Sequence, residues 1–128
     1  MRILVVMDDK KRIEELVLLL NQASDAYYGS QDEMLRAMNR IHEDINSGKV
    51  TGPITKELFE DYLDTKGLPM PDLLIRTSGE QRLSNFLLWQ LAYSEFYFAD
   101  VHWPDFSKEE LIKAIEAYNL RERRYGKV

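Results

Sequence analysis

Short apolar runs along the chain predict buried β-strands. Residues 2–7 are apolar and partly β-branched, and residues 72–76 form a second run that is too short for a free-standing helix. A third short strand is expected at residues 95–98. Apolar runs of this length are typical of strands in a parallel sheet, where both faces are covered.

Longer stretches with helical spacing alternate with these runs. Ser30 and Glu33 form a capping box, and Gly48 ends the helix whose apolar face carries Met34, Met38, Ile41 and Ile45. Ser107 and Glu110 repeat the capping pattern before a second helix, with Leu111, Ile115 and Tyr118 on one face. A shorter helix should start at Pro53 and Thr55, another helix is predicted over residues 83–93, and a turn is predicted at residues 103–105.

One segment fits two alternatives. Ile13, Leu16, Val17 and Leu20 keep helical spacing, yet residues 17–20 also form a continuous apolar run that suits a strand. Both interpretations of residues 10–22 stay open. The alternation of strands and helices predicts an α/β fold with a parallel-rich sheet flanked by helices, in a single domain over residues 1–128.

Composition narrows the classes of function. The chain has 128 residues, of which 45% are hydrophobic and 30% charged, as in an ordinary globular domain. No apolar run approaches the roughly 20 residues of a spanning helix, and we expect no signal peptide. The absence of cysteine excludes disulfides and thiolate metal sites. A net charge of −5 argues against a general nucleic-acid binder, whereas the basic end of the chain suits one anionic ligand, through Arg121, Arg123, Arg124 and Lys127.

The candidate chemistry gathers just after the predicted strand at residues 72–76. Arg76 and Arg82 stand six residues apart, with Thr77, Ser78 and Gly79 between them and Ser84 beyond. Polar side chains at the carboxyl end of a strand are what an α/β sheet presents to a ligand. Two guanidinium groups and nearby hydroxyls suit a diphosphate, although a pair of surface arginines in a polar loop would have the same pattern.

The same block resembles the cis-prenyltransferases, the family of undecaprenyl diphosphate synthase. The matching segments are Arg76-Thr-Ser-Gly-Glu80, Arg82-Leu-Ser84-Asn85-Phe-Leu-Leu-Trp-Gln90, Ala92-Tyr-Ser-Glu95, Trp103-Pro-Asp-Phe106 and Arg121-Glu-Arg-Arg124-Tyr-Gly126. Members of that family condense isopentenyl diphosphate with an allylic diphosphate in cis, in the cytoplasm or at the membrane surface through their lipid product. The resemblance implies the fold of the family's C-terminal half and a role in isoprenoid biosynthesis for the cell wall.

The resemblance also assigns roles to individual residues. It implies that Arg76, Arg82 and Ser84 bind the phosphates of isopentenyl diphosphate, with Glu80 and Asn85 as supporting residues. It further implies that Glu95 helps to hold Mg²⁺, and that Arg124 and Gly126 reach across a dimer interface to the partner's site. Each role has a simpler structural alternative: Ser84 could cap the helix over residues 83–93, Glu95 could be a solvated residue, and Arg124 with Gly126 could simply end a helix.

The chain departs from the family at its beginning. The resemblance starts near Met1 and covers about the second half of a member, so the Asp-Gly-Asn-Gly-Arg-Trp and Phe-Ser-Thr-Glu-Asn-Trp segments have no counterpart. The family's Asn-Tyr-Gly-Gly is replaced by Tyr27-Tyr28-Gly29-Ser30. The alternatives to an active enzyme are therefore a non-catalytic binding or regulatory subunit that pairs with a full-length synthase, and an inert fragment that forms a structural homodimer.

Overall fold

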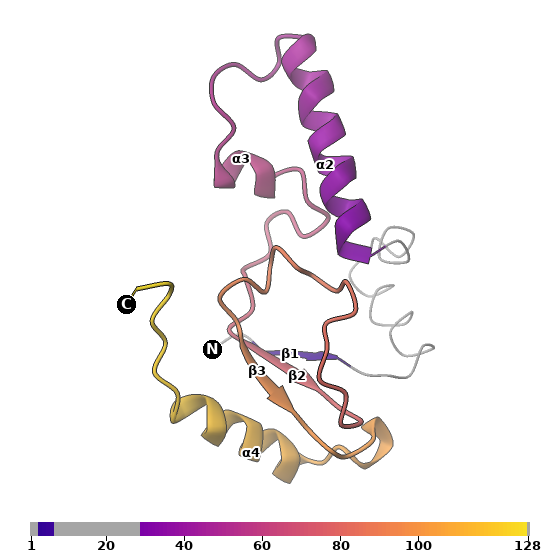
Figure 1. Ribbon diagram of the computed structural model, residues 1–128, viewed down its shortest axis with the longest axis vertical. Coiled ribbons are helices and arrows are strands. Elements are labelled where there is room, and N and C mark those ends of the chain that lie inside the picture. Colours follow the sequence, from indigo (N-terminus) through magenta and orange to yellow (C-terminus); the bar gives the residue numbers. More distant parts are fainter. Residues whose placement is uncertain (1–2, 7–28, 128) are drawn as a thin grey trace.

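A small parallel sheet forms the centre of the molecule, a computed structural model that describes residues 3–6 and 29–127 (Figure 1). Its strands are β1 (Ile3–Val6), β2 (Leu73–Arg76) and β3 (Glu95–Phe98), in the order β1-β2-β3 with both pairs parallel. Leu73 lies opposite Ile3 and Glu95, and Arg76 lies opposite Val6 and Phe98. The three predicted strands and the parallel-rich α/β fold are confirmed.

Helix α4 (Lys108–Asn119) covers one face of this sheet. Its N-cap is Ser107, whose hydroxyl accepts from the Glu110 N–H at 3.3 Å, so this capping prediction is confirmed. Alternate strand residues share a face, so Leu73 and Ile75 point together towards α4. They form a buried cluster with Ala114, packed against Tyr97, Phe106, Leu111 and Tyr118. The predicted turn before α4 is the 3₁₀ helix η2 (Trp103–Asp105).

A second cluster lies beyond the sheet, where α2 (Gly29–Asn46) and α3 (Lys56–Glu60) are side by side (Figure 1). The short helix predicted after Pro53 is confirmed: it begins at Lys56, and Thr55 caps it by accepting from the Leu58 N–H at 3.1 Å. The buried residues of this cluster are Ala37, Ile41, Phe59 and Leu63, with Met34, Tyr62 and Trp89 packed against them. The described part of the chain therefore has two small apolar cores, one between the sheet and α4 and one between α2 and α3.

The capping box predicted at Ser30 is wrong, although the helix itself is confirmed. Ser30 lies inside α2, and its hydroxyl accepts from the Leu88 N–H at 2.9 Å. The Glu33 carboxylate accepts from the Asp64 N–H at 2.9 Å and from the Gln90 side chain. Both side chains are buried, and they bind groups of distant segments rather than the end of their own helix. The buried face accordingly differs from the predicted one and consists of Ser30, Glu33, Ala37 and Ile41.

The helix predicted over residues 83–93 is also wrong, because this part of the crossover from β2 to β3 consists of turns. Ser84, Asn85 and Leu87 have φ values of 50°, 63° and 44°, which belong to the left-handed region. Asn85 is bound to the first turn of α2 instead: its backbone oxygen accepts from the Ser30 N–H at 2.7 Å, and its Oδ1 accepts from the Gln31 N–H at 2.9 Å. These tertiary contacts override the local helical pattern.

The alternatives for residues 10–22 lie outside the described residues. No helix within residues 29–127 is long and apolar enough to cross a membrane.

Candidate diphosphate-binding site

The turn that follows β2 is pinned to the segment that follows β3. The Ser78 N–H donates to the Val101 carbonyl at 2.8 Å, and the Gly79 N–H donates to the Ala99 carbonyl at 2.9 Å. Ser78 and Gly79 both have a φ of 67°, which folds the chain sharply at this point. His102 adds a polar contact, with its Nδ1 3.2 Å from the Ser78 hydroxyl oxygen. The carboxyl edge of the sheet thus carries a fixed polar turn, where parallel α/β sheets bind their ligands.

Arg76 and Thr77 enter this turn from the end of β2 and are both buried. The backbone of Arg76 accepts from the Ala99 N–H at 2.8 Å, which extends the β2–β3 ladder by one bond. The Thr77 hydroxyl has no hydrogen-bond partner within the described part of the chain. A guanidinium and a hydroxyl at the carboxyl edge of a parallel sheet are groups that suit recognition of an anion.

Arg82 and Ser84 lie farther along the crossover and are exposed. The Arg82 guanidinium forms an ion pair with the Glu80 carboxylate, and 64% of the Arg82 side chain is accessible. An exposed ion pair contributes little stability, so a diphosphate can replace Glu80 as the partner of Arg82 at small cost. Ser84 is not the cap of a following helix, because residues 83–93 form none, and Asn85 beside it anchors the crossover to α2.

The other predicted site residues lie at the opposite edge of the sheet. Glu95 pairs with Leu73 at the amino end of the strands, whereas Arg76 stands at their carboxyl end. Arg121 Nη1 donates to Glu95 Oε2 at 2.8 Å. Arg124 is exposed and forms an ion pair with Glu122 at 3.1 Å, while Gly126 has a φ of 76° beside Tyr93. A single chain therefore does not bring Glu95, Arg124 and Gly126 together with Arg76.

The carboxylate of Glu95 does not belong to a metal site formed by the described residues. No three His, Asp or Glu side chains gather within residues 29–127 in a way that could hold an ion. Mg²⁺ favours several oxygen ligands, whereas the described partner of Glu95 is the cation Arg121. The residues within 29–127 therefore do not fit Mg²⁺ by themselves.

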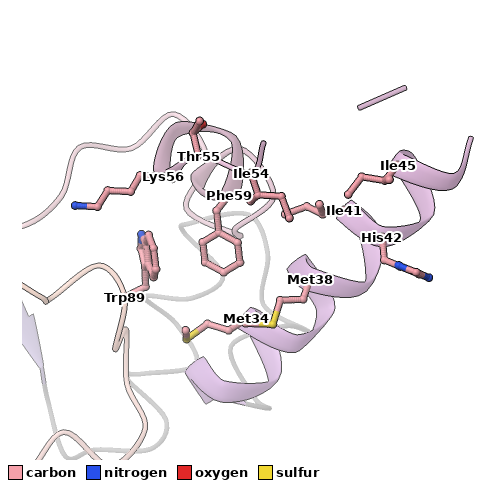
Figure 2. A pocket seen from close by; sticks show the side chains of 10 residues that line it. All are labelled: Met34, Met38, Ile41, His42, Ile45, Ile54, Thr55, Lys56, Phe59 and Trp89. Atoms are coloured by element: carbon pink, nitrogen blue, oxygen red, sulfur yellow. The ribbon is translucent and has the colours of Figure 1, made fainter. Parts of the chain in front are cut away.

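An apolar groove between α2 and α3 differs from the polar turn in the side chains that line it. Its volume is about 490 Å³, and Figure 2 shows Met34, Ile41, Phe59 and Trp89 pointing towards one another within it. Among its lining residues in the described part of the chain, His42, Thr55 and Lys56 are polar and none is an arginine. The turn after β2 has two arginines beside it, whose planar guanidinium groups suit a diphosphate, so it is the stronger candidate for such a ligand.

Comparison with known proteins identifies the family of this chain. The profile of the family described as "Putative undecaprenyl diphosphate synthase" matches residues 6–126. Isoprenyl transferases of Chlamydia trachomatis, Clostridium perfringens and Bacillus cereus are 53%, 54% and 49% identical over 88%, 77% and 95% of this chain. The chain spans only 43%, 40% and 46% of the length of these relatives.

Solved structures show the same relationship. Lavandulyl diphosphate synthase from Lavandula x intermedia, in complex with dimethylallyl diphosphate, superimposes with a TM-score of 0.75 at 31% identity. A probable undecaprenyl diphosphate synthase from Campylobacter jejuni superimposes with a TM-score of 0.66 at 30% identity. The match covers 98% of this chain in both cases, and 60% and 63% of those chains. The chain belongs to the undecaprenyl diphosphate synthase family of cis-prenyltransferases.

Proposed function

We propose that this chain binds isopentenyl diphosphate for a prenyltransferase that condenses it with an allylic diphosphate. The observation that carries this proposal is the pinned turn after β2, with Arg76 at its beginning and Arg82 just beyond it. Family membership supports it, because relatives about half identical to the chain are isoprenyl transferases.

The three residues proposed to bind the diphosphate have different roles. Arg76 is buried and fixed by the end of β2, so it defines where one phosphate rests. Arg82 is exposed and exchanges its ion pair with Glu80 for the second phosphate. The Ser84 hydroxyl supplies a further donor. Fixed cationic donors of this kind stabilise charge on a diphosphate without reorganising during the reaction.

Arg124 and Gly126 are proposed to serve the site of another subunit, either a second copy of this chain or a full-length synthase. They lie at the amino edge of the sheet, away from Arg76, and the Arg124 side chain is 65% accessible. A residue displayed in this way is available to a neighbouring molecule. The same position suits a non-catalytic subunit that lends its tail to a partner.

Magnesium enters the proposal only through the family. When bound, Mg²⁺ neutralises charge on phosphate oxygens. Glu95 is the one acidic residue among the predicted ligands, and its oxygen already accepts from Arg121. Because the described residues do not fit the ion, no step is assigned to it.

Calorimetric titration with isopentenyl diphosphate tests the proposed site. Arg82→Ala should weaken binding by about 1.5–3 kcal/mol, the scale of a hydrogen bond to a charged group. Arg82→Lys should recover part of this loss, because an ammonium keeps the charge without the fork.

The matched control is Lys49→Ala. It removes one positive charge from a side chain that is 74% accessible, just past the end of α2 that lies farthest from the sheet (Figure 1). Its affinity should equal that of the unaltered chain. Equal affinity in Arg82→Ala would remove the turn from the site.

A further inference from the structure

Arg123 is the centre of a hydrogen-bond network at the amino edge of the sheet. Its Nη1 donates to Asp72 Oδ1 at 2.9 Å and to the Tyr118 hydroxyl at 2.8 Å, and its Nη2 donates to the Tyr93 carbonyl at 3.0 Å. These acceptors come from the residue before β2, from α4 and from the approach to β3. One side chain therefore joins the end of the chain to three separate parts of the fold.

Aromatic contacts extend the network along the tail. The Arg123 guanidinium lies 4.5 Å from the centre of the Tyr125 ring and 5.6 Å from that of Tyr118. The Tyr125 ring in turn meets the Tyr93 ring at a centroid distance of 6.1 Å. Cation–π contacts of this kind strengthen where the cation is shielded from water. Arg123 therefore holds its own segment of the chain in place and also positions the side chain of Tyr125.

The neighbouring arginines of the tail are held far more loosely. The Arg123 side chain is 16% accessible and its partner Asp72 is 13% accessible, compared with 42% for Arg121 and 65% for Arg124. The Asp72 carboxylate, through its hydrogen bond, raises the pKa of Arg123 above its usual value. Removing one partner of a sheltered ion pair destabilises a protein more than removing one partner of an exposed pair.

The tail depends on this anchor because it has little regular structure of its own. Between residues 121 and 127 the backbone donates from Arg121 to the Tyr118 carbonyl and from Lys127 to the Arg124 carbonyl. The second of these closes a turn in which Tyr125 and Gly126 have φ values of 49° and 76°. Non-glycine residues adopt such angles only where surrounding contacts hold them, and the Tyr125–Arg123 contact is one of these.

We propose that Arg123 is a positioning residue, which holds the turn at residues 124–127 so that Arg124 and Gly126 meet the diphosphate bound by another subunit. The inference rests on the proposed function, since it needs Arg124 to act on that ligand. Arg123 itself touches Asp72, Tyr118 and Tyr93 and is not assigned a contact with the ligand.

Two measurements on the full 128-residue chain test this. The first is amide hydrogen exchange of Arg123→Ala, which should speed exchange at residues 121–127 at least tenfold and leave β2 and α4 unchanged. The second is calorimetry with isopentenyl diphosphate, at concentrations where light scattering shows more than one subunit. Arg123→Ala and Arg124→Ala should weaken binding by the same factor, and the double variant by no more than either.

Conservative variants separate positioning from charge. Arg123→Lys keeps the charge but cannot reach all three acceptors, so it should recover only part of the affinity. Lys49→Ala also removes one positive charge, from an exposed side chain whose ion-pair partner is Asp44 in α2, and it should bind normally.

Several results would overturn the inference. Unchanged exchange in Arg123→Ala would show that the tail does not depend on this side chain, and faster exchange throughout β2 would make it a general stabilising residue. If the unaltered chain binds isopentenyl diphosphate and Arg124→Ala binds it equally well, the tail does not contribute to the site of another subunit. If the unaltered chain does not bind isopentenyl diphosphate at all, the proposed function fails, and the exchange experiment alone decides whether Arg123 anchors the tail.

Discussion

A single tyrosine links α2 to the turn that follows α3. The Tyr62 hydroxyl donates to the Asp44 carboxylate, and Lys49 lies 3.4 Å from the same oxygen. The Tyr62 hydrogen bond is the main reason why the pKa of Asp44 is below its usual value, and the same bond raises the pKa of Tyr62. The hydrogen bond from Tyr62 and the charge of Lys49 therefore both lower the pKa of Asp44.

Replacing Tyr62 by phenylalanine should raise the pKa of Asp44 towards its ordinary value. A carboxyl with a lowered pKa in the folded chain contributes stability above its unfolded pKa of about 4, and that stability is lost as the pH falls through the folded pKa. The variant should therefore lose part of this pH dependence at acid pH. Titration of the Asp44 carboxyl by NMR measures the shift directly.

The Tyr93→Phe variant serves as the control, because the Tyr93 ring packs against Tyr125 and the described contacts of Asp44 do not include it. It should leave the titration of Asp44 unchanged. An Asp44 pKa that stays low in Tyr62→Phe would mean that the cations Lys49 and Arg40, and not Tyr62, control this carboxylate.

At the scale of elements, the first turn of α2 depends on a residue 54 positions away in sequence. Asn85 Oδ1 accepts from the Gln31 N–H, and Asn85 itself is left-handed, with a φ of 63°. The two segments also approach closely, since a side chain added at Gly29 would stand 2.5 Å from Asn85 Nδ2. Asn85 therefore has the role of a cap supplied from outside the helix.

The Asn85→Ala variant should lower the free energy of unfolding by about 1–2 kcal/mol, through loss of the cap and the cost of a left-handed alanine. Asn85→Asp keeps an acceptor and tolerates the same backbone, so it should lose less. Urea denaturation of both variants provides the comparison. Equal stability of Asn85→Ala and the unaltered chain would contradict the capping role.

Local patterns were sufficient for elements that depend on neighbouring residues. The strands at β2 and β3, the Ser107 cap and the Thr55 cap follow from periodicity and from hydrogen bonds that span three residues. Residues 83–93 could not be predicted in this way, because Asn85 and Ser30 are joined by contacts between distant segments. The same limit applies to Ser30 and Glu33, whose spacing is that of a capping box although both side chains bind distant segments.

The candidate site shows the same division. Arg76 could be placed at a strand end from sequence because the apolar run stops there. The roles of Arg123 and Asp72 could not, since these two residues are 51 positions apart in sequence and are brought together only by the fold. The separation of Glu95 from Arg76 likewise depends on the parallel register of β2 and β3.

At the scale of the whole molecule, the described chain presents its two sets of predicted ligands at opposite edges of one sheet. Arg76 lies at the carboxyl edge, and the tail with Arg124 and Gly126 lies at the amino edge. This arrangement suits a two-fold symmetric dimer. In such a dimer the same contact occurs twice, so the tail of each subunit would complete the site of the other.

We expect that the purified 128-residue chain binds isopentenyl diphosphate but makes no long polyprenyl product. Long products require an allylic diphosphate site and a set of metal-binding carboxylates. The sequence contains no Asp-Gly-Asn-Gly-Arg-Trp segment, and Asp8, the one candidate substitute, is followed by Asp9 and Lys10 rather than glycines. Asp8 lies outside the described residues. Each missing transition-state contact typically costs about 3 kcal/mol, a factor of hundreds in rate.

A steady-state assay with radiolabelled isopentenyl diphosphate, farnesyl diphosphate and Mg²⁺ decides between the remaining roles. We expect no turnover by the chain alone. Activation of a complete synthase upon mixing, lost in Arg124→Ala, would identify a subunit that lends its tail, whereas no effect on the synthase would indicate an inert fragment. Turnover by the chain alone that Asp8→Ala abolishes would contradict the prediction, because Asp8 would then supply the allylic site without the family's glycine-rich backbone.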